Sequence, residues 1–399
     1  MNQPLMPVPV ALDQMLAFID TSPTIEVRPV NQALGFRVAN DLRARFDSPL
    51  SANSAMDGFA LRSADSQKSL PVSQRIAAGA VPNPLAEGTA ARIFTGAILP
   101  LGADTVVMQE DCVVIDGELR VLSGGAPGDH IRAQGSDVQA GSILCRKGDL
   151  VSPPLMGLLA SQGLSQISVF RRPRVALVQS GDELVELGSD LHPGGIYNSN
   201  RSLLEGLVRR HGGTIVGVWS APDALEDTIQ ILREAAESAD VVITTGGVSV
   251  GEADHIKPAI EHLGELHLWR LALKPGKPFA FGTINHTPIL GLPGNPSSVL
   301  ITFTFLARPV LGWLQGAQDT ALPYFWGRAQ FERSAGTRTE YLRGSVVSRG
   351  VETWLEPLAQ QSSGALSAAV ACDVLIVVPA GQSTERGAPI QFIPMSAVV

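Results

Sequence analysis

The stretch DVVITTGGVSVGEAD, residues 240–254, decides the fold class of this chain. It reads as a buried strand that ends in a glycine turn, and the helical pattern DHIKPAIEHLG overlaps its end. The same order of strand, turn and helix occurs around RVALVQSGDEL (174–184) and PILGLPGNPSS (288–298). Strands that alternate with helices of about 10–15 residues predict a doubly wound parallel α/β domain over about 174–315.

On both sides of this domain the pattern changes to short β-branched runs. Residues 48–140 alternate such runs with Gly and Pro turns, and the Asp116–Gly117 pair predicts a hairpin. After Leu322 a second series of short runs predicts a small C-terminal β domain. Short helices are expected at 11–19, 31–40 and 153–164. We therefore expect four parts: a discontinuous linking domain (1–47 and 141–170), a β-rich domain (48–140), the α/β domain (171–318) and a C-terminal β domain (321–399).

Composition excludes several classes of protein. The 399 residues suggest several domains at about 150 residues each. Lys and Arg total 30 against 38 Asp and Glu, and this net charge of −8 argues against a nucleic-acid surface. Hydrophobic residues make up 45% of the chain, which excludes a disordered protein. The three widely spaced cysteines argue against a disulfide framework or zinc site. With no secretory pattern and no run of 18 apolar residues, we expect a soluble cytoplasmic protein.

Candidate site residues gather where strands end. Ligands of an open parallel sheet bind beyond the carboxyl ends of its strands, and four predicted ends carry glycine turns with acids, lysines or hydroxyls. These are residues 180–183, 246–254, 274–278 and 293–298. Glycines let backbone N–H groups approach an anion, two lysines supply point charges, and carboxylates are ligands that Mg²⁺ prefers. Singly, each motif suits an ordinary turn or helix cap, but together they predict a site for a phosphorylated ligand and a metal.

At these residues the sequence resembles the MoeA family, the molybdopterin molybdenumtransferases, to which the E domain of gephyrin and its plant counterpart also belong. The resemblance covers nearly the whole chain. Its segments are NSAMDGFA (53–60), FTGAILPLGADTVVMQED (94–111), GSDVQAG (135–141), SGDEL (180–184), IYNSNR (196–201), TTGGVSVGEAD (244–254), LKPGKPFAFG (273–282) and GLPGNPSS (291–298). The implied fold is multidomain α/β plus β: a doubly wound parallel-sheet molybdopterin-binding domain, an N-terminal mixed/β region and a small C-terminal β domain.

The resemblance implies an enzyme that inserts molybdate into adenylylated molybdopterin, needs Mg²⁺ and releases AMP. It implies a homodimer whose cleft combines the α/β domain of one subunit with the β domain of the other, and other cofactor-biosynthesis proteins as further partners. The catalytic residues would be Asp57, Asp137, Glu183, Asp254, Lys274 and Lys277, with Asp137, Glu183 and Asp254 as metal ligands. Ligand contacts would come from Thr95, Asp182, Gly246, Gly247, Ser249, Gly251, Pro293, Gly294, Asn295, Pro296, Ser298, Arg338 and Ser363.

The chain departs from the family pattern at one turn that usually carries an acidic pair. Ser220 and Ala221 stand there instead, and Asp223 is nearby but offset, so its role is not carried over. Two other functions remain open on the sequence. One is a non-catalytic molybdopterin-binding scaffold, against which the joint retention of SGDEL, GEAD and KPGKP argues. The other is the molybdopterin adenylyltransferase step, against which the flanking β regions argue.

Overall fold

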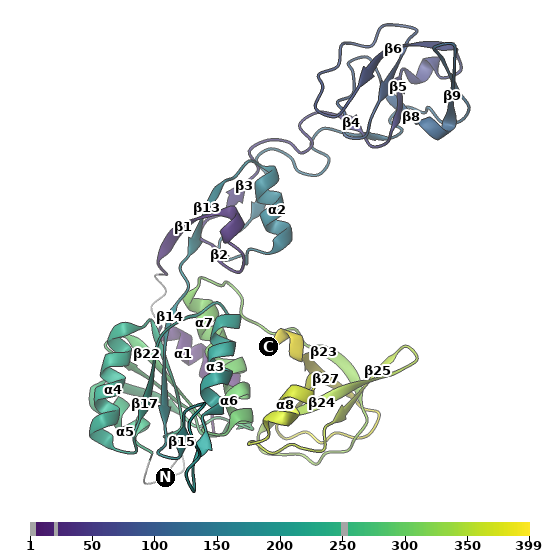
Figure 1. The fold of residues 1–399 in the computed structure, drawn as a ribbon. Helices are drawn as coiled ribbons and strands as arrows, with labels where there is room; N and C mark the ends of the chain where they lie inside the picture. Colours follow the sequence, from purple (N-terminus) through teal and green to yellow (C-terminus); the bar gives the residue numbers. More distant parts are fainter. Residues whose placement is uncertain (1–4, 20–22, 249–253) are drawn as a thin grey trace. The chain divides into compact units, whose positions relative to one another are not determined.

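The computed structural model describes residues 5–19, 23–248 and 254–399. The chain divides into two compact units (Figure 1). The first comprises Met1–Ala39, Gly148–Val151 and Ile167–Val399, and the second comprises Asn40–Lys147 and Ser152–Gln166. The first unit holds the α/β domain and the C-terminal β domain. The four-part division of the chain stays a prediction.

The α/β domain is built on a six-stranded sheet in which five strands run in the same direction. Its strands, in spatial order, are β17 (Thr214–Ala221), β14 (Arg174–Ser180), β18 (Val241–Thr245), β22 (Thr287–Leu292), β21 (Ala280–Ile284) and β19 (Glu265–Trp269). The predicted parallel sheet is thus confirmed, with one exception. β21 runs the opposite way because a two-residue turn, Asn285–His286, joins it directly to β22, and both turn residues have positive φ.

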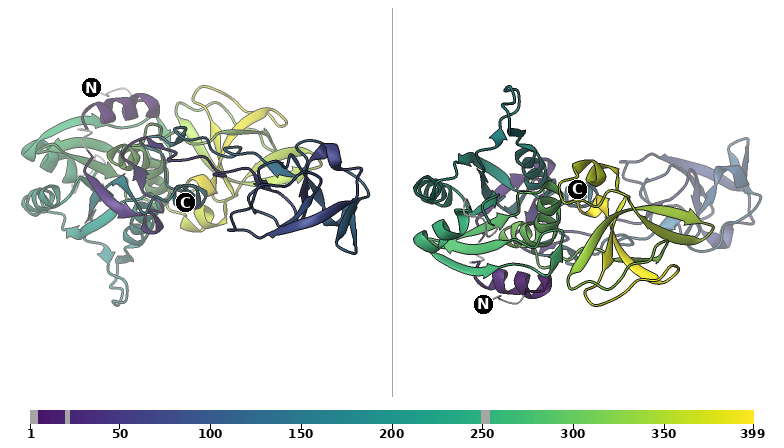
Figure 2. Two further views of the ribbon diagram at one scale, coloured as in Figure 1. Left: turned by 90° about the horizontal axis from the view of Figure 1, so that it is seen from above. Right: turned by 90° about the horizontal axis from the view of Figure 1, so that it is seen from below.

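Helices cover both faces of this sheet, as the doubly wound prediction requires (Figures 1 and 2). One face carries α1 (Val8–Ala17), α3 (Ser199–Arg210), α6 (Pro296–Thr302) and α7 (Arg308–Leu314), and the other carries α4 (Leu225–Ser238) and α5 (Ile256–Leu263). Successive residues of β14 point to opposite faces. Val175 and Leu177 join the first core cluster, whereas Ala176 and Val178 join the second. The apolar stretch 175–178 of β14 therefore lies between two cores.

The helical stretch Pro296–Leu314 is long and apolar enough to cross a membrane, but 78% of its most apolar window is buried inside the protein. A π-helical turn, Phe303–Ala307, joins α6 to α7 within it. Core residues such as Val299, Phe303 and Leu311 pack in the same cluster as the sheet. Its apolar character is therefore explained by its place in the core.

The C-terminal domain is a small β barrel. Its strands are β23 (Phe325–Ala329), β24 (Thr339–Arg349), β25 (Glu352–Pro357), β26 (Val374–Val378) and β27 (Pro389–Pro394). The pairing of β24 with both β25 and β26 closes the sheet. A short helix, α8 (Leu366–Ala371), lies beside α6 (Figure 1). The prediction of a small C-terminal β domain is confirmed.

The N-terminal region contributes a small sheet of β1 (Ile25–Pro29), β13 (Gln166–Phe170) and β2 (Arg37–Val38) to the first unit. The helix predicted over 31–40 is wrong. Only a 3-10 turn, Val30–Gln32, forms there, and a left-handed Gly35 then turns the chain into β2. The backbone N–H of Val38 donates to the carbonyl of Asp149, so sheet pairing overrides the local helical pattern.

The second unit is mainly β, as predicted for residues 48–140. Its six-stranded sheet contains β5 (Gly58–Leu61), β6 (Leu70–Ile76), β7 (Ala90–Ile93), β8 (Thr105–Met108), β9 (Cys112–Ile115) and β10 (Glu118–Val121). Asp116 and Gly117 have φ of 52° and 83° and form the β9–β10 hairpin turn. The helix α2 (Pro153–Ser161) is also confirmed, and the Ser152 side chain caps it.

Candidate active site

The carboxyl ends of β14, β18 and β22 lie side by side, and the loops that follow them enclose a cavity. The strands are parallel neighbours, so these loops start at the same edge of the sheet. The cavity has a volume of about 230 Å³. It is lined by Ser180, Gly181, Glu183, Asp223, Gly246, Gly247, Val248, Asp254, Pro278, Pro293 and Gly294. Three of the four predicted strand-end motifs therefore converge here, and the fourth reaches it through Pro278.

Two glycines in this cavity allow a close approach of backbone to backbone. Gly246 and Gly247 have φ of 81° and 64°, a conformation that favours glycine. A Cβ on Gly247 would lie 2.7 Å from the Ile256 side chain, and one on Gly246 would overlap the Ser180 carbonyl oxygen. Both glycines line the cavity, and backbone N–H groups of such a turn suit an anionic ligand. The predicted Ser249 and Gly251 lie outside the described residues.

Carboxylates form the acidic wall of the cavity. Glu183 and Asp254 line it as predicted, whereas Asp182 turns to the neighbouring loop, where its Oδ1 accepts from the N–H of Asp223 at 3.2 Å. Within residues 5–19, 23–248 and 254–399, no three His, Cys, Asp or Glu side chains are arranged to hold a metal alone. Carboxylate oxygens have the right chemistry for Mg²⁺, so the ligand would have to complete its coordination.

Asp223 is a residue that the sequence reasoning missed. Positions 220 and 221 belong to β17 and pair with Gln179 and Ser180 of β14. Ala221 is buried in the core on the side of the sheet that α4 covers, so an acid at this position would not face the cavity. Asp223 lies just past the strand and lines the cavity instead. In the sequence, Asp223 is offset from the position of the family's acidic pair. The structure explains this offset, because β17 continues through Ala221 and the chain enters the cavity just beyond it.

The lysine loop, residues 274–278, begins at a strand that pairs with a different sheet from the one predicted. β20 (Leu273–Lys274) pairs in parallel with β24 of the C-terminal barrel, with Leu273 opposite Thr339 and Lys274 opposite Glu340. Arg338 adds a side-chain bond, since its Nη1 donates to the Leu273 carbonyl at 3.2 Å. The start of the KPGKP segment therefore pairs with the barrel, whereas the Lys277 carbonyl further along accepts from the Leu271 N–H at 2.9 Å.

A second cavity, of about 410 Å³, lies between the lysine loop and the barrel. Four cationic side chains and one carboxylate line it: Lys274, Lys277, Arg333, Arg338 and Glu340. The predicted residues Pro293, Asn295, Ser298 and Ser363 line it too, while Pro296 begins α6 beside it. Pro278 and Pro293 border both cavities, so the acidic and the basic cavity are neighbours.

A buried arginine lies beneath the Ser363 loop. Arg343 is 1% exposed, and its Nη2 donates to the Ser362 carbonyl. Its Nε and Nη1 have no hydrogen-bond partner in the part of the chain that the structure describes. Burial lowers the pKa of this guanidinium. Because the Ser363 carbonyl accepts from the Ser297 N–H at 2.9 Å, Arg343 supports the loop that meets the start of α6. Sequence reasoning selected Arg338 and missed Arg343, whose burial no local signal reveals.

The remaining predicted residues lie in the second unit. Asp57 is exposed, and its Oδ1 accepts from both the N–H and the hydroxyl of Thr95 at 2.8 Å. These bonds, the backbone bond first, lower the pKa of Asp57. Asp137 is exposed on a loop whose backbone is bonded to Ser48. The structure thus brings Asp57 and Thr95 together within this unit.

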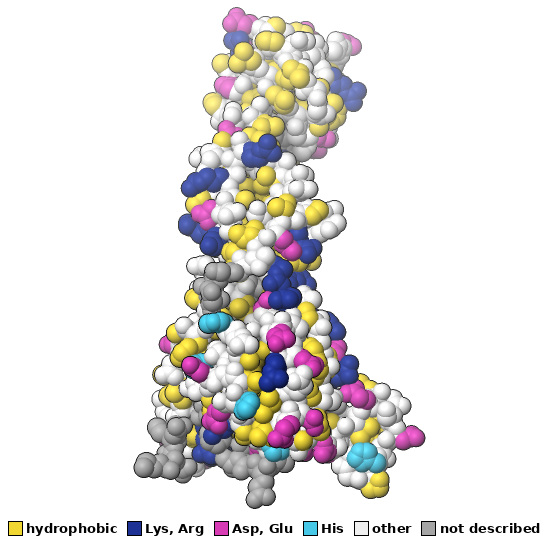
Figure 3. Space-filling model, turned by 90° about the vertical axis from the view of Figure 1, so that its left-hand side faces the viewer, with side chains coloured by type: hydrophobic (Ala, Val, Ile, Leu, Met, Phe, Trp, Pro, Cys, Tyr) yellow, Lys and Arg dark blue, Asp and Glu magenta, His cyan; other side chains and the backbone are white. Residues whose placement is uncertain are grey.

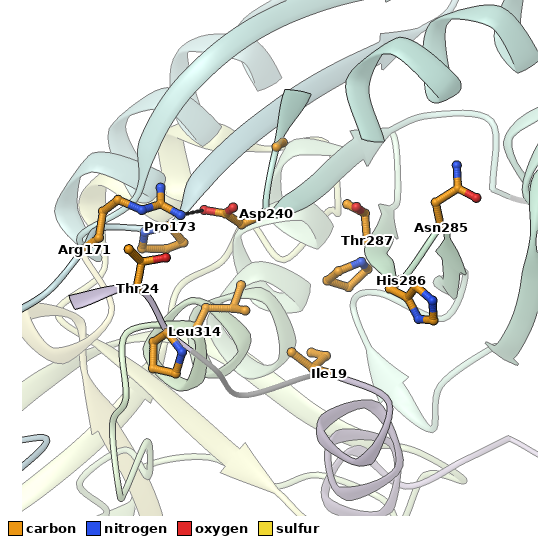
Figure 4. Close-up of a pocket in the computed structure, with 12 residues that line it drawn as sticks. Ile19, Thr24, Arg171, Pro173, Asp240, Asn285, His286, Thr287 and Leu314 are labelled. Atoms are coloured by element: carbon orange, nitrogen blue, oxygen red, sulfur yellow. Dashed lines mark hydrogen bonds and ion pairs between the residues drawn. The ribbon is translucent and has the colours of Figure 1, made fainter. Parts of the chain in front are cut away.

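Another cavity, at the amino-terminal edge of the α/β sheet, is not a candidate for the same chemistry (Figure 4). Its main charged groups, Arg171 and Asp240, already form an ion pair of 3.0 Å with each other. Thr287 donates to the Ala236 carbonyl. The two opposite charges therefore already neutralise each other, which leaves little net charge to attract a charged ligand. On the face in Figure 3, basic and acidic side chains are interspersed.

Comparisons with known proteins agree with this architecture. Three family models match: the MoeA N-terminal region (domain I and II) over residues 6–163, a probable molybdopterin binding domain over 176–313, and the MoeA C-terminal region (domain IV) over 329–395. A molybdopterin molybdenumtransferase from Haemophilus influenzae is 35% identical over 94% of both chains. One from Nostoc sp. is 36% identical over 92% of this chain and 87% of its own.

Solved structures give the same result for the fold. A molybdopterin biosynthesis MoeA protein from Pyrococcus horikoshii has a TM-score of 0.84 at 26% identity and covers 98% of this chain and 100% of its own. Another solved structure of a molybdopterin biosynthesis MoeA protein from Pyrococcus horikoshii has a TM-score of 0.79 at 30% identity, over 98% of this chain and 99% of its own. From the family models and from relatives that align over nearly its whole length, the chain belongs to the MoeA family.

Proposed function

We propose that this protein inserts molybdate into adenylylated molybdopterin and releases AMP, in a Mg²⁺-dependent reaction of molybdenum-cofactor biosynthesis. The observation that carries the proposal is the pair of adjoining cavities. One offers carboxylates and glycine N–H groups, and the other offers four cations, with Pro278 and Pro293 shared between them. The proposed substrates bring together a phosphoanhydride, in adenylylated molybdopterin, and an oxyanion, molybdate. Two neighbouring cavities of these kinds suit such a pair of substrates. The family assignment supports the same substrates.

The overall reaction balances without any redox change. The two thiols of molybdopterin each lose a proton, and molybdate loses one oxo group with those protons as water. A water molecule in turn cleaves the P–O–P bond, which leaves the molybdopterin phosphate and AMP. No covalent intermediate with the protein is required, so catalysis comes from positioning and charge neutralisation.

Each wall of the two cavities has a proposed role. Lys274 and Lys277 bind anionic oxygens of the pyrophosphate or of molybdate, and the N–H groups of Gly246 and Gly247 bind the phosphates. Glu183, Asp254 and Asp223 would hold Mg²⁺, which supplies polarisation of the phosphoanhydride when bound. Ser298 and Ser363 offer hydroxyls at the rim of the basic cavity.

We also propose that the protein is a cytoplasmic homodimer. Asp57, Thr95 and Asp137 lie in the second compact unit, apart in sequence from the cavities of the first. In a two-fold dimer each subunit could supply these residues to its partner, so one contact would complete two sites. A stable monomer with full activity, shown by light scattering, would contradict this part of the proposal.

The decisive assay is AMP release from adenylylated molybdopterin in the presence of molybdate and Mg²⁺. We expect release by the wild type and loss of release in Lys277→Ala. Glu352→Gln serves as a control for loss of a charge away from the cavities. Glu352 pairs with Arg328 at 2.8 Å in the C-terminal barrel and lies outside both cavities. Ligand binding without release would indicate a scaffold, and synthesis of the adenylylated compound from ATP would indicate an adenylyltransferase.

A further inference from the structure

Glu340 is a buried carboxylate in the wall of the basic cavity, and two cations share it. Its Oε1 accepts from Lys274 Nζ at 2.6 Å, and its Oε2 accepts from Arg333 Nη2 at 2.6 Å and Nε at 3.0 Å. The side chain is only 10% exposed. A carboxylate in a cavity suited to an anion opposes the charge of the ligand, so it calls for an explanation.

The first effect of Glu340 is to fix the ammonium group of Lys274. That side chain is 46% exposed and has four rotatable bonds, so on its own it would sample many orientations. The backbone register places the two residues directly opposite each other on β20 and β24. An ammonium group has three N–H donors, and the one used by Glu340 leaves two for a ligand.

The second effect of Glu340 is to withdraw charge from the ligand. Lys274 and Arg333 are both paired with it, whereas Lys277 and Arg338 line the same cavity without an ion-pair partner among the described residues. An entering oxyanion thus meets two unpaired cations and two that are already partly neutralised. The difference between the paired and the unpaired cations is thus due to the Glu340 side chain.

We propose that Glu340 is a positioning residue that orients Lys274 and limits how tightly the basic cavity holds its oxyanion. This inference rests on the proposed function, in which the oxyanion must leave the cavity for the dithiol. Binding the oxyanion more tightly before the reaction than during it lowers turnover. A carboxylate that reduces the positive charge of the cavity therefore favours transfer of the oxyanion to the dithiol over its retention in the cavity.

The test replaces Glu340 by Gln, which keeps the size of the side chain and an oxygen acceptor for Lys274 but removes the charge. Tungstate alone serves as the probe, and calorimetry of the full chain at low ionic strength measures its Kd. We expect E340Q to bind tungstate about three- to tenfold more tightly than the wild type, with a gain that shrinks as salt rises. In the AMP-release assay the KM for molybdate and kcat should both fall.

Three further variants make the outcome decisive. E340D keeps the charge and should bind tungstate no more tightly than the wild type. E340A removes both the charge and the acceptor that fixes Lys274, so it should bind tungstate more tightly than the wild type but with a smaller gain than E340Q. It covers the case in which E340Q does not fold. E352Q removes a carboxylate of the same barrel outside the cavity and should leave Kd unchanged.

The results separate this inference from the proposed function. If K277A abolishes tungstate binding but folded E340Q and E340A bind it as the wild type does, or more weakly, the role of Glu340 is refuted and the cavity stands. If the wild type itself does not bind tungstate, the oxyanion cavity is refuted. A kcat that falls while KM rises would indicate a merely structural role.

Discussion

Replacing Gly246 by Ala should destabilise the first unit, whereas the same change at Gly294, a few ångströms away, should not. Gly246 has φ of 81°, and a Cβ there would lie well under 3.0 Å from the carbonyl oxygen of Ser180. For Gly294 the nearest atom to an added Cβ is the Gly246 Cα at 3.9 Å, which is ordinary contact. The two glycines thus form a matched pair on neighbouring loops.

The magnitude follows from two terms. A non-glycine residue in the left-handed conformation costs about 1–2 kcal/mol. A clash that backbone must move to relieve adds about 1–3 kcal/mol. The free energy of unfolding should therefore fall by about 2–5 kcal/mol, which for a unit of this size lowers Tm by roughly 5–15 °C. Gly294→Ala should stay within about 2 °C of the wild type.

Tryptophan fluorescence during heating measures this change selectively. All five tryptophans of the chain belong to the first unit: Trp219, Trp269, Trp313, Trp326 and Trp354. The signal therefore reports the unfolding of that unit without a contribution from the other. If the two alanine variants melt at the same temperature, the close approach of Gly246 to β14 does not constrain the residue at this position.

Three other predictions address charges. Asp254→Ala and Lys277→Ala should each reduce AMP release by about a hundredfold with no change in Tm, because a lost charge on a loop removes ligand contacts rather than packing; a large drop in Tm would show a structural role instead. Asp223→Asn should raise the Mg²⁺ concentration needed for half-maximal AMP release, and an unchanged Mg²⁺ titration would remove Asp223 from the site. Burial lowers the pKa of His211, whose Nε2 lies 3.0 Å from the Val398 carbonyl oxygen. As the pH falls, the unfolded chain therefore protonates this side chain before the folded chain does. The free energy of unfolding should fall as the pH drops below about 6.5. Denaturation of His211→Gln at pH 7 and pH 5 should show a smaller difference than in the wild type.

The sequence by itself determined the local elements and the edge at which the site forms. The runs at 175–178 and 241–245 became parts of central strands, because a strand between two helical layers buries the side chains on both of its faces. The Asp116–Gly117 pair made its hairpin turn, and Gly212, with φ of 80°, follows the end of α3. These features depend on residues within a few positions of each other, so a single sequence is enough to predict them.

Only the tertiary structure decided which walls complete the site. Lys274 and Glu340 are 66 positions apart, and nothing in the pattern around either residue encodes the β20–β24 pairing that places them opposite each other. Asp223 enters the acidic cavity because β17 continues through Ala221 before the chain turns. Arg343 is buried because the loop that carries Ser363 closes over it. In each case the position of a charge depends on hydrogen bonds between distant segments, and such pairing has no local sequence signal.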